Sequence, residues 1–200
     1  MSERFPDWPT LYRDQSAETM PWYFADLDPD IEHELQTLGI AHGRVLDLGT
    51  GPGTQAIELA VRGFTVTATD LAQAAIESAR ALARTRGVDV EFVVDDVLDS
   101  RVGGSFDVVI DRGCFHTLAP ERRAAYVAFV GARLPSDKHL LLKCFSHLQP
   151  GDVGPYRFTA EQIAECFASA FELASARPTI YQGTLEQKPH AWSCVLVRRP

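Results

Sequence analysis

The sequence predicts an α/β fold: a doubly wound, mostly parallel seven-stranded sheet that ends in an antiparallel hairpin, with helices on both faces. Three observations support this expectation. Short apolar runs alternate repeatedly with helix-like segments, which is typical of a parallel sheet built from strand–helix–strand units. A glycine-rich turn joins the first apolar run to the helix after it. The last two apolar runs are separated only by a short polar connection, which predicts an antiparallel pair.

Length and composition are those of one globular domain. Hydrophobic residues make up 46% and charged residues 23% of the 200 residues, which is ordinary for a chain that buries a core. We expect a single domain over 1–200, with an N-terminal lid or helical segment over 1–40 and a sheet core over 41–200. The aromatic density of residues 1–27 argues against a disordered tail, and we expect part of this segment to close a pocket.

Charge and cysteine usage limit the partners that we expect. The net charge is −8 and no cluster of Lys and Arg is present, so nucleic-acid binding is not expected. The four cysteines form no Cys-x-x-Cys pair and the histidines show no ligand spacing, so no metal is expected. Without a signal-peptide core or an apolar run of membrane-spanning length, we expect a cytoplasmic protein that does not contact membranes. The oligomeric state stays open.

Caps and helix breakers place the elements in order. Asp28 and Pro29 fit the N-cap and first position of a helix, Gly63 and Gly87 each follow one, and a capping box begins at Thr159. Helices are therefore expected over residues 29–38, 55–62, 71–86, 122–134 and 159–170. Strands are expected over residues 44–48, 64–70, 88–94, 106–110, 139–145, 171–181 and 192–198.

The turn after the first strand has the features of a site for a nucleotide-like ligand. Asp47 lies near the end of the apolar run, and Gly49, Gly51 and Gly53 alternate through the turn. Glycines here let the backbone approach a ligand, and the first N–H groups of the new helix point toward it. Asp70 closes the second strand about twenty residues after Gly49, the offset at which an acid reaches a ribose.

Carboxylates recur at the carboxyl ends of the predicted parallel strands, where ligands lie in open α/β sheets. Asp47, Asp70, Asp96 and Asp111 mark four of these ends, and His147 follows the fifth strand. A single carboxylate at a strand end is commonly a helix cap or a turn residue. Four in sequence order favour a ligand site.

The glycine turn also carries a family resemblance. The run over 45–54 resembles the first motif of class I S-adenosylmethionine-dependent methyltransferases, and Asp70 resembles their ribose-binding acid. The family has a Rossmann-like fold with a terminal antiparallel hairpin. Asp111-Arg112-Gly113 and Met20-Pro21-Trp22 resemble segments of the thiopurine methyltransferase branch, which methylates small molecules on sulfur and related soft atoms. The glycine spacing departs from the nicotinamide fingerprint Gly-x-Gly-x-x-Gly, so an NAD(P)-dependent oxidoreductase is the less favoured alternative.

The resemblance implies S-adenosyl-L-methionine as cofactor, S-adenosyl-L-homocysteine as product, and a role for each candidate residue. Asp47 would orient the methionine part, Asp70 would accept from both ribose hydroxyls, and Asp96 would accept from the adenine amino group, with Asp95 as its rival. The carbonyl of Gly113 would face the methionine ammonium. The expected cofactor-binding residues are Trp22, Asp47, Gly49, Gly51, Gly53, Asp70, Leu71, Asp96, Val97, Asp111 and Gly113.

The implied reaction is methyl transfer to a small molecule through sulfur, oxygen or another soft atom. His116 and His147 are the candidate catalytic bases, because histidine exchanges protons near neutral pH, although a loop histidine bonded to backbone is the common alternative. Arg112 would bind an acidic substrate or pair with Asp111. The expected substrate-binding residues are Tyr23, Arg112, Phe115 and His116. The competing hypothesis is a module of this fold that holds the cofactor without turnover.

Overall fold

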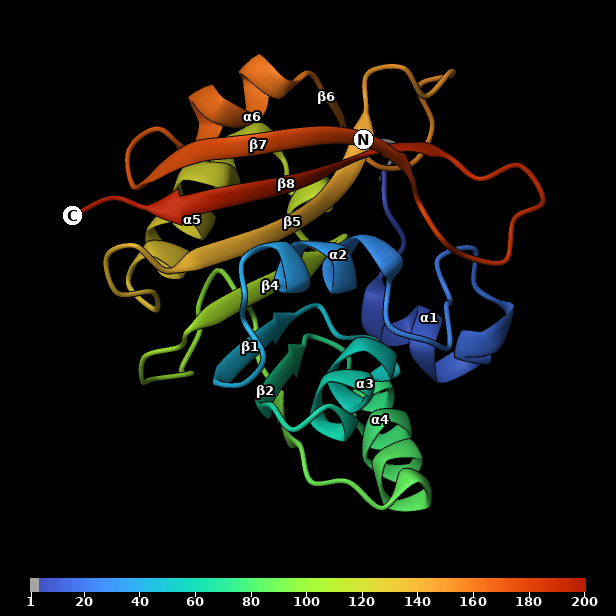
Figure 1. Ribbon diagram of the computed structural model, residues 1–200. Helices are drawn as coiled ribbons and strands as arrows, with labels where there is room; N and C mark the ends of the chain where they lie inside the picture. The colour runs from blue at the N-terminus through green and yellow to red at the C-terminus, as the bar shows by residue number, and fades with distance from the viewer. Residues whose placement is uncertain (1–3) are drawn as a thin grey trace.

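The computed structural model describes residues 4–200, and one sheet forms its centre (Figure 1). Its strands are β1 Arg44–Leu48, β2 Thr65–Asp70, β3 Glu91–Val94, β4 Val108–Arg112, β5 His139–Ser146, β6 Arg157–Phe158, β7 Phe171–Ile180 and β8 His190–Arg198. The strand order is β3-β2-β1-β4-β5-β8-β7, with the two-residue β6 paired to β5 off this path. Strands β1 to β6 run parallel to one another. Strand β8 runs antiparallel to both of its neighbours, β5 and β7. The predicted doubly wound sheet with a terminal hairpin is confirmed.

The helices are α1 Trp8–Asp14, α2 Pro29–Thr37, α3 Thr54–Val61, α4 Gln73–Arg86, α5 Arg123–Gly131 and α6 Ala160–Phe167. Helices α2 to α6 cover the two faces of the sheet with apolar side chains, whereas α1 has no buried residue and lies against α4. One apolar core joins α2, α3 and α4 to the sheet, and a second joins α5 and α6 to its other face. Within residues 4–200, no helix combines the length and the apolar character needed to cross a membrane.

The local signals in the sequence place most element ends correctly. The Asp28 side chain accepts from the Asp30 N–H at 3.0 Å, and Thr159 forms the expected capping box with Gln162. Two strands begin later than expected, at Glu91 and Val108 rather than at residues 88 and 106. The edge strand β3 begins only where it gains a partner in β2. Before β4, the Phe106 N–H donates to the Arg133 carbonyl, which lies outside the sheet.

A buried ion cluster joins the start of α2 to the middle of the sheet. The Asp28 carboxylate, which is fully buried, accepts from Lys143 Nζ at 2.7 and 2.8 Å and from Arg112 Nε at 2.7 Å. Lys143 on β5 is 2% exposed and also donates to Asp30 at 2.6 Å. Arg177 on β7 completes the cluster by donating to Asp30 at 2.7 Å. Buried charges of this kind are tolerated only when they are paired, so the cluster fixes the chain before α2 against β4, β5 and β7.

Replacing Asp28 with alanine tests this cluster. The substitution leaves Arg112 without a carboxylate and Lys143 with Asp30 alone, and removing one partner of a buried pair costs about 3–5 kcal/mol. We expect the free energy of unfolding to fall by roughly that amount in urea denaturation followed by circular dichroism. Asp14→Ala is the control, because its pair with Arg13 is exposed and its loss leaves stability nearly unchanged. Similar stabilities for the two variants would contradict a supporting role for Asp28.

Candidate functional site

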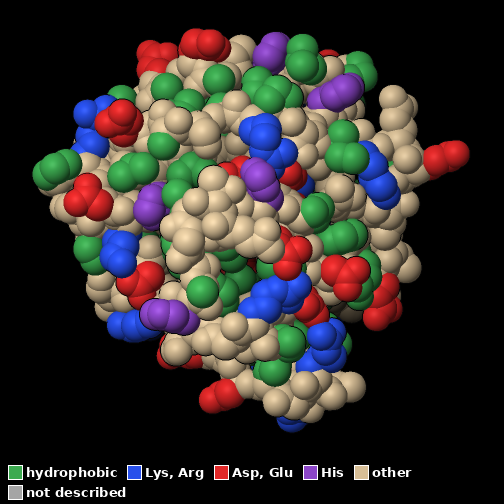
Figure 2. Space-filling model, viewed as in Figure 1, with side chains coloured by type: hydrophobic (Ala, Val, Ile, Leu, Met, Phe, Trp, Pro, Cys, Tyr) green, Lys and Arg blue, Asp and Glu red, His purple; other side chains and the backbone are tan. Residues whose placement is uncertain are grey.

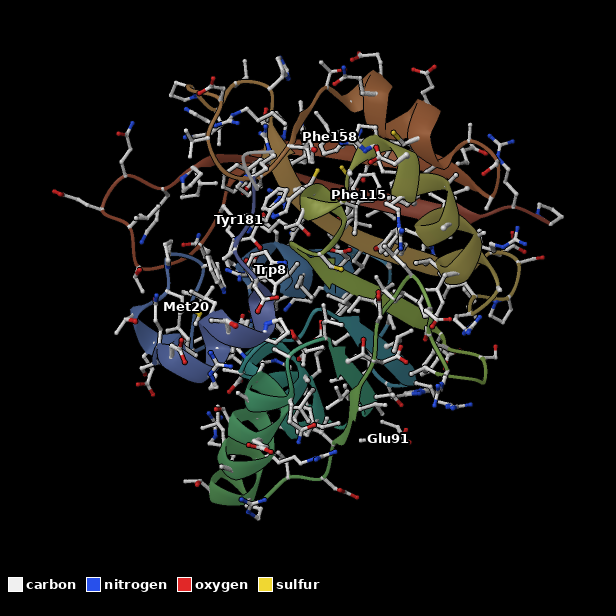
Figure 3. The ribbon with its side chains drawn as sticks, turned by 180° about the vertical axis from the view of Figure 1, so that it is seen from behind. Trp8, Met20, Glu91, Phe115, Phe158 and Tyr181 are labelled. Atoms are coloured by element: carbon white, nitrogen blue, oxygen red, sulfur yellow. The ribbon has the colours of Figure 1, made fainter. Side chains whose placement is uncertain are left out.

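A pocket of about 650 Å³ opens at the carboxyl edge of the parallel strands. Its floor is the turn after β1, the end of β2 and the residues that follow β4. Its walls are the N-terminal segment, the loop over 149–155 and the connection between β7 and β8. Trp8 and Tyr181, which Figure 3 labels, line it from the first helix and from the end of β7. The site therefore lies where ligands bind in open α/β sheets.

The turn after β1 has a shape that only glycine permits. Gly51 has a φ of 55°, and a Cβ there would lie 2.8 Å from the Tyr12 hydroxyl. Gly53 has a φ of 79°, and its Cβ would lie 2.7 Å from the Cβ of Ala79 in α4. Gly53 lines no part of the pocket: it brings α3 and α4 together behind the turn. Gly49 and Gly51 form the surface that faces the pocket.

Asp70 at the end of β2 is held in place by backbone donors. Its Oδ2 accepts from the Gly51 N–H at 2.8 Å and its Oδ1 from the Ala72 N–H at 2.9 Å. Burial raises the pKa of Asp70, and these N–H groups oppose that shift by favouring the carboxylate. Each oxygen keeps a second acceptor position, so the side chain can accept from two hydroxyl groups in the pocket.

Asp47 lies beside Asp70 in the pocket floor and is 2% exposed. Its Oδ2 accepts from the Thr50 hydroxyl at 2.6 Å. Burial raises the pKa of Asp47 to about 7, with the nearby charges of Asp111 and Asp70 adding to the shift. This carboxyl group therefore changes its protonation state near neutral pH.

Asp111 supports the loop after β4 instead of facing the pocket. Its buried carboxylate accepts from the N–H groups of Gly113, Cys114 and Phe115, at 2.8–2.9 Å, and from the Tyr126 hydroxyl at 2.5 Å. Gly113, with a φ of 105°, follows in the pocket floor. In the structure this side chain shapes the loop that brings Gly113 to the pocket.

Arg112 pairs with Asp28, not with Asp111. Its other N–H groups donate to the carbonyls of Trp22, at 3.0 Å, and Gln182, at 2.7 Å. The guanidinium also lies 4.7 Å from the centre of the Tyr181 ring. Arg112 lines the pocket, but its charge is neutralised by Asp28 and its donors hold the pocket walls.

His116 and His147, the two expected bases, have different surroundings. His116 lines the pocket and is 4% exposed, and burial lowers its pKa to about 3, helped by the charge of Arg112. His147 is exposed and lies outside the pocket, with its ring 6.1 Å from that of Trp192. The His147 N–H donates to the Phe158 carbonyl at 2.9 Å, beside the short pairing of β5 with β6. His147 is therefore not among the residues that line the pocket.

The remaining predicted residues divide between the pocket and its surroundings. Phe115 is wholly buried in the core, with its ring 5.2 Å from that of Phe158, so it cannot meet a substrate (Figure 3). Asp96, whose Oδ1 accepts from the Leu98 N–H at 2.9 Å, lies outside the pocket with Val97 and the half-exposed Leu71. The predicted residues that line the pocket are Trp22, Tyr23, Asp47, Gly49, Gly51, Asp70, Arg112, Gly113 and His116.

Several pocket residues were not predicted individually. Tyr12 on α1 accepts from Trp22 Nε1 at 3.1 Å and covers Gly51. The aromatic density of the first 27 residues was the signal that this segment covers a pocket. Phe145 closes the predicted fifth strand, whose carboxyl end is expected at the ligand edge. Tyr181 carried no such signal, because only the folded sheet brings the end of β7 to this edge.

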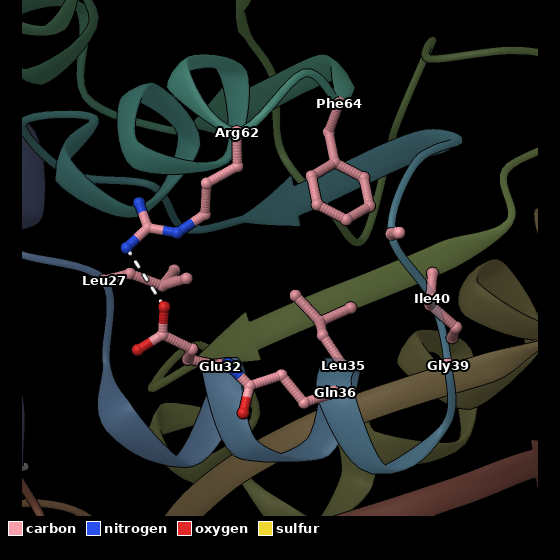
Figure 4. Close-up of a pocket in the computed structure, with 9 residues that line it drawn as sticks. Leu27, Glu32, Leu35, Gln36, Gly39, Ile40, Arg62 and Phe64 are labelled. Atoms are coloured by element: carbon pink, nitrogen blue, oxygen red, sulfur yellow. Dashed lines mark hydrogen bonds and ion pairs between the residues drawn. The ribbon is translucent and has the colours of Figure 1, made fainter.

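A second hollow, of about 340 Å³, lies between α2, α3 and the chain before β1 (Figure 4). Leu35, Ile40 and Phe64 give it an apolar floor, and Arg62 pairs with Glu32 at 3.2 Å across it. It is at the amino edge of the sheet, away from the glycine turn. On the face shown in Figure 2, Lys and Arg side chains are scattered among acidic ones and form no continuous patch. The larger pocket is therefore the candidate site.

Comparison with known proteins agrees with the geometry of the pocket. Residues 45–136 match the family described as methyltransferase domain. The chain is 35% identical over 115 residues to an uncharacterised methyltransferase of Schizosaccharomyces pombe, covering 56% of this chain and 78% of that one. It is 29% identical over 187 residues to 2-heptyl-1-hydroxyquinolin-4(1H)-one methyltransferase of Mycobacteroides abscessus, covering 89% and 82% of the two chains.

Solved structures share the whole fold. A structure that concerns the conversion of a disulfide bond into a thioacetal group during echinomycin biosynthesis superposes with a TM-score of 0.84 at 27% identity, over 96% of this chain and 92% of the other. The 1,6-didemethyltoxoflavin-N1-methyltransferase of Burkholderia thailandensis, solved with bound 1,6-didemethyltoxoflavin and S-adenosylhomocysteine, superposes with a TM-score of 0.73 at 24% identity, over 94% of this chain and 81% of the other. The chain belongs to the class I S-adenosylmethionine-dependent methyltransferases.

Proposed function

We propose that this methyltransferase acts on a small molecule and methylates a sulfur, oxygen or other soft atom. The main support is one pocket that joins the glycine turn and Asp70 to a space walled by aromatic side chains. Its volume of about 650 Å³ suits small ligands, which typically bind in pockets of about 300–1,000 Å³. The aromatic residues of the pocket are Phe5, Trp8, Tyr12, Trp22, Tyr23, Phe24, Phe145 and Tyr181.

The relatives support a small acceptor. The Mycobacteroides abscessus enzyme is named for a hydroxyquinolinone, and the Burkholderia thailandensis enzyme was solved with 1,6-didemethyltoxoflavin. The structure with a TM-score of 0.84 concerns a thioacetal, a sulfur group. The resemblance of Asp111-Arg112-Gly113 to the thiopurine methyltransferase branch likewise supports sulfur as an acceptor atom.

The floor of the pocket fits S-adenosylmethionine. We assign the backbone of Gly49 and Gly51 to the methionine part, because these glycines line the pocket and add no side chain of their own to its floor. Asp70 has the two acceptor positions that a pair of ribose hydroxyls requires. The carbonyl of Gly113 would face the ammonium group. Asp96, which lies beyond the end of β3, keeps its proposed role at the adenine.

S-adenosylmethionine supplies an activated methyl group, so the protein has mainly to align the acceptor and exclude water. Alignment alone can lower a barrier by about 7–11 kcal/mol. Trp22 and Tyr12, which are hydrogen-bonded to each other, would cover the glycine turn and limit the entry of water. Arg112 holds two walls of the pocket in position through its bonds to Trp22 and Gln182.

Turnover separates this function from a module that only holds the cofactor. We expect labelled S-adenosylmethionine to yield S-adenosylhomocysteine when the protein is incubated with a panel of small thiols, phenols and amines, at least one thiol or phenol being methylated. The Asp70→Ala variant is the matched control, because any S-adenosylhomocysteine that it still forms would come from a reaction that does not depend on the proposed cofactor site. Tight binding of S-adenosylhomocysteine with no product from any acceptor would favour the module.

The Asp70→Ala variant also tests the ribose position. Hydrogen bonds to a charged group contribute about 1.5–3 kcal/mol, so the Kd for S-adenosylhomocysteine should rise about 10- to 150-fold, measured by calorimetric titration. Asp70→Asn keeps one acceptor oxygen and should lose less. Asp89→Ala, at an exposed carboxylate far from the turn, is the control. Unchanged affinity in Asp70→Ala would place the ribose elsewhere.

The raised pKa of Asp47 predicts a pH-dependent preference for the cationic donor. Below its pKa of about 7 the carboxyl group is neutral, and above it the carboxylate attracts a sulfonium. The ratio of the Kd of S-adenosylhomocysteine to that of S-adenosylmethionine should therefore rise as the pH increases through 7. Taking the ratio cancels the amino and carboxyl groups that the two ligands share. Asp47→Asn should remove the rise, and a rise that persists in this variant would contradict the assignment to Asp47.

A further inference from the structure

The His116 ring is fixed by three contacts. Its Nδ1 accepts from the Phe145 N–H at 3.1 Å, and the Phe145 ring meets it edge-on at 5.1 Å. The Tyr181 ring stacks on it at 5.7 Å and 28°. The His116 carbonyl accepts from the Tyr156 N–H at 2.8 Å, so its backbone is held as well. A ring held in this way cannot turn over without losing a buried hydrogen bond.

The bond to Phe145 determines where the ring carries its proton. A backbone N–H can only donate, so Nδ1 must offer its lone pair, and the neutral ring then carries its hydrogen on Nε2. The charged neighbour is Arg112 on β4, which disfavours a second proton. The titratable neighbour is Tyr181, whose hydroxyl donates to the Arg112 carbonyl at 2.6 Å. Burial keeps the pKa of His116 at about 3, so the ring stays neutral in ordinary buffers.

The Nε2 atom faces the part of the pocket next to Gly113. A Cβ at Gly113 would lie 3.1 Å from it, so Nε2 is directly beside the floor that we assign to the donor. The hydrogen bonds of residues 4–200 include none at Nε2, although His116 lines the pocket. An N–H donor without a protein partner is thus presented to the space left for the acceptor.

Neither His116 itself nor the two described residues beside its ring that could titrate, Tyr181 and Cys114, supply a base, and Asp47 and Asp70 are assigned to the cofactor. The lone pair of His116 is already engaged at Nδ1. The Tyr181 hydroxyl donates to the Arg112 carbonyl, and burial raises its pKa, so it stays protonated. Burial raises the pKa of Cys114 well above its usual range, so its thiol stays protonated. Asp47 and Asp70 lie in the floor, where Thr50 and backbone N–H groups hold them.

We propose that His116 is a neutral, fixed hydrogen-bond donor to the reacting atom of the acceptor, and that the acceptor is a flat aromatic thiol or acidic hydroxyl that ionises without a base from the protein. This inference rests on the proposed function. The acceptor loses its proton to water before transfer. Its lone pair then forms the bond to the methyl carbon, while the carbon–sulfur bond of S-adenosylmethionine breaks with its electron pair left on sulfur. The aromatic walls match a flat ring, and the Nε2–H stabilises its anionic atom.

The state of His116 can be tested without turnover. In the ¹⁵N-labelled protein saturated with S-adenosylhomocysteine, NMR should show His116 as the Nε2–H tautomer, unchanged from about pH 5 to pH 9. The signal is assigned by its loss in His116→Gln. A ring that titrates near neutral pH, or that carries its proton on Nδ1, would overturn the proposed donor.

The acceptor class can be tested with ring-substituted thiophenols and phenols of graded acidity. The rise of kcat/KM with pH should have a midpoint that follows the pKa of each acceptor. His116→Phe should lose about 10- to 100-fold in kcat/KM with every acceptor, because a hydrogen bond to a charged atom is lost. His116→Gln, whose amide can donate from nearly the same position, should lose less. One midpoint shared by all acceptors and absent in His116→Gln would identify His116 as a base and overturn the proposal.

The panel also separates the failure of this inference from that of the proposed function. Methylation of aliphatic thiols or alcohols, with none of the graded aromatic acids methylated, would overturn the acceptor class and leave the function standing. No product from any acceptor, with S-adenosylhomocysteine still bound, would overturn the proposed function and this acceptor class together. The NMR measurement reports the tautomer and the protonation of the His116 ring in either case.

Discussion

The architecture of the site depends on one buried carboxylate. Asp28 precedes α2 in sequence, yet its side chain neutralises Lys143 from β5 and Arg112 from β4 at the centre of the fold. Two cations side by side in a dry environment would repel each other and would lack solvation. Because Asp28 contacts both cations, with Asp30 as a second partner of Lys143, a displaced chain before α2 would leave Arg112 without its carboxylate.

This constraint extends to the rim of the pocket through Arg112. With Nε bound to Asp28, the guanidinium directs its remaining donors to the carbonyls of Trp22 and Gln182. These carbonyls belong to the N-terminal segment and to the β7–β8 connection, which are far apart in the sequence. The residue that sequence patterns suggest for substrate charge recognition thus positions the walls between which a substrate would lie.

Burial shifts the pKa values of two side chains of the pocket, Asp47 and His116, in opposite directions. It raises the pKa of Asp47 to about 7 and lowers that of His116 to about 3, in each case because the charged form loses solvation. Both pKa shifts favour the neutral form of the side chain in the pocket. A site of this kind suits a reaction whose donor is already activated, because it depends on placement and on exclusion of water more than on proton transfer by the protein.

Features of the fold and the pocket that depend on neighbouring residues or on a fixed spacing could be predicted from the amino-acid sequence. The glycine turn, Asp70 at the end of β2 and the cap at Asp28 each depend on residues close in the chain or on a fixed spacing, and the structure has them as expected. Two contacts of the site depend on the folded chain. Arg112 pairs with Asp28, which lies 84 residues away in the sequence. Nδ1 of His116 accepts from the N–H of Phe145 on β5. Such contacts leave no periodic trace in sequence, because they depend on which strands become neighbours in the sheet and on how much water remains between them.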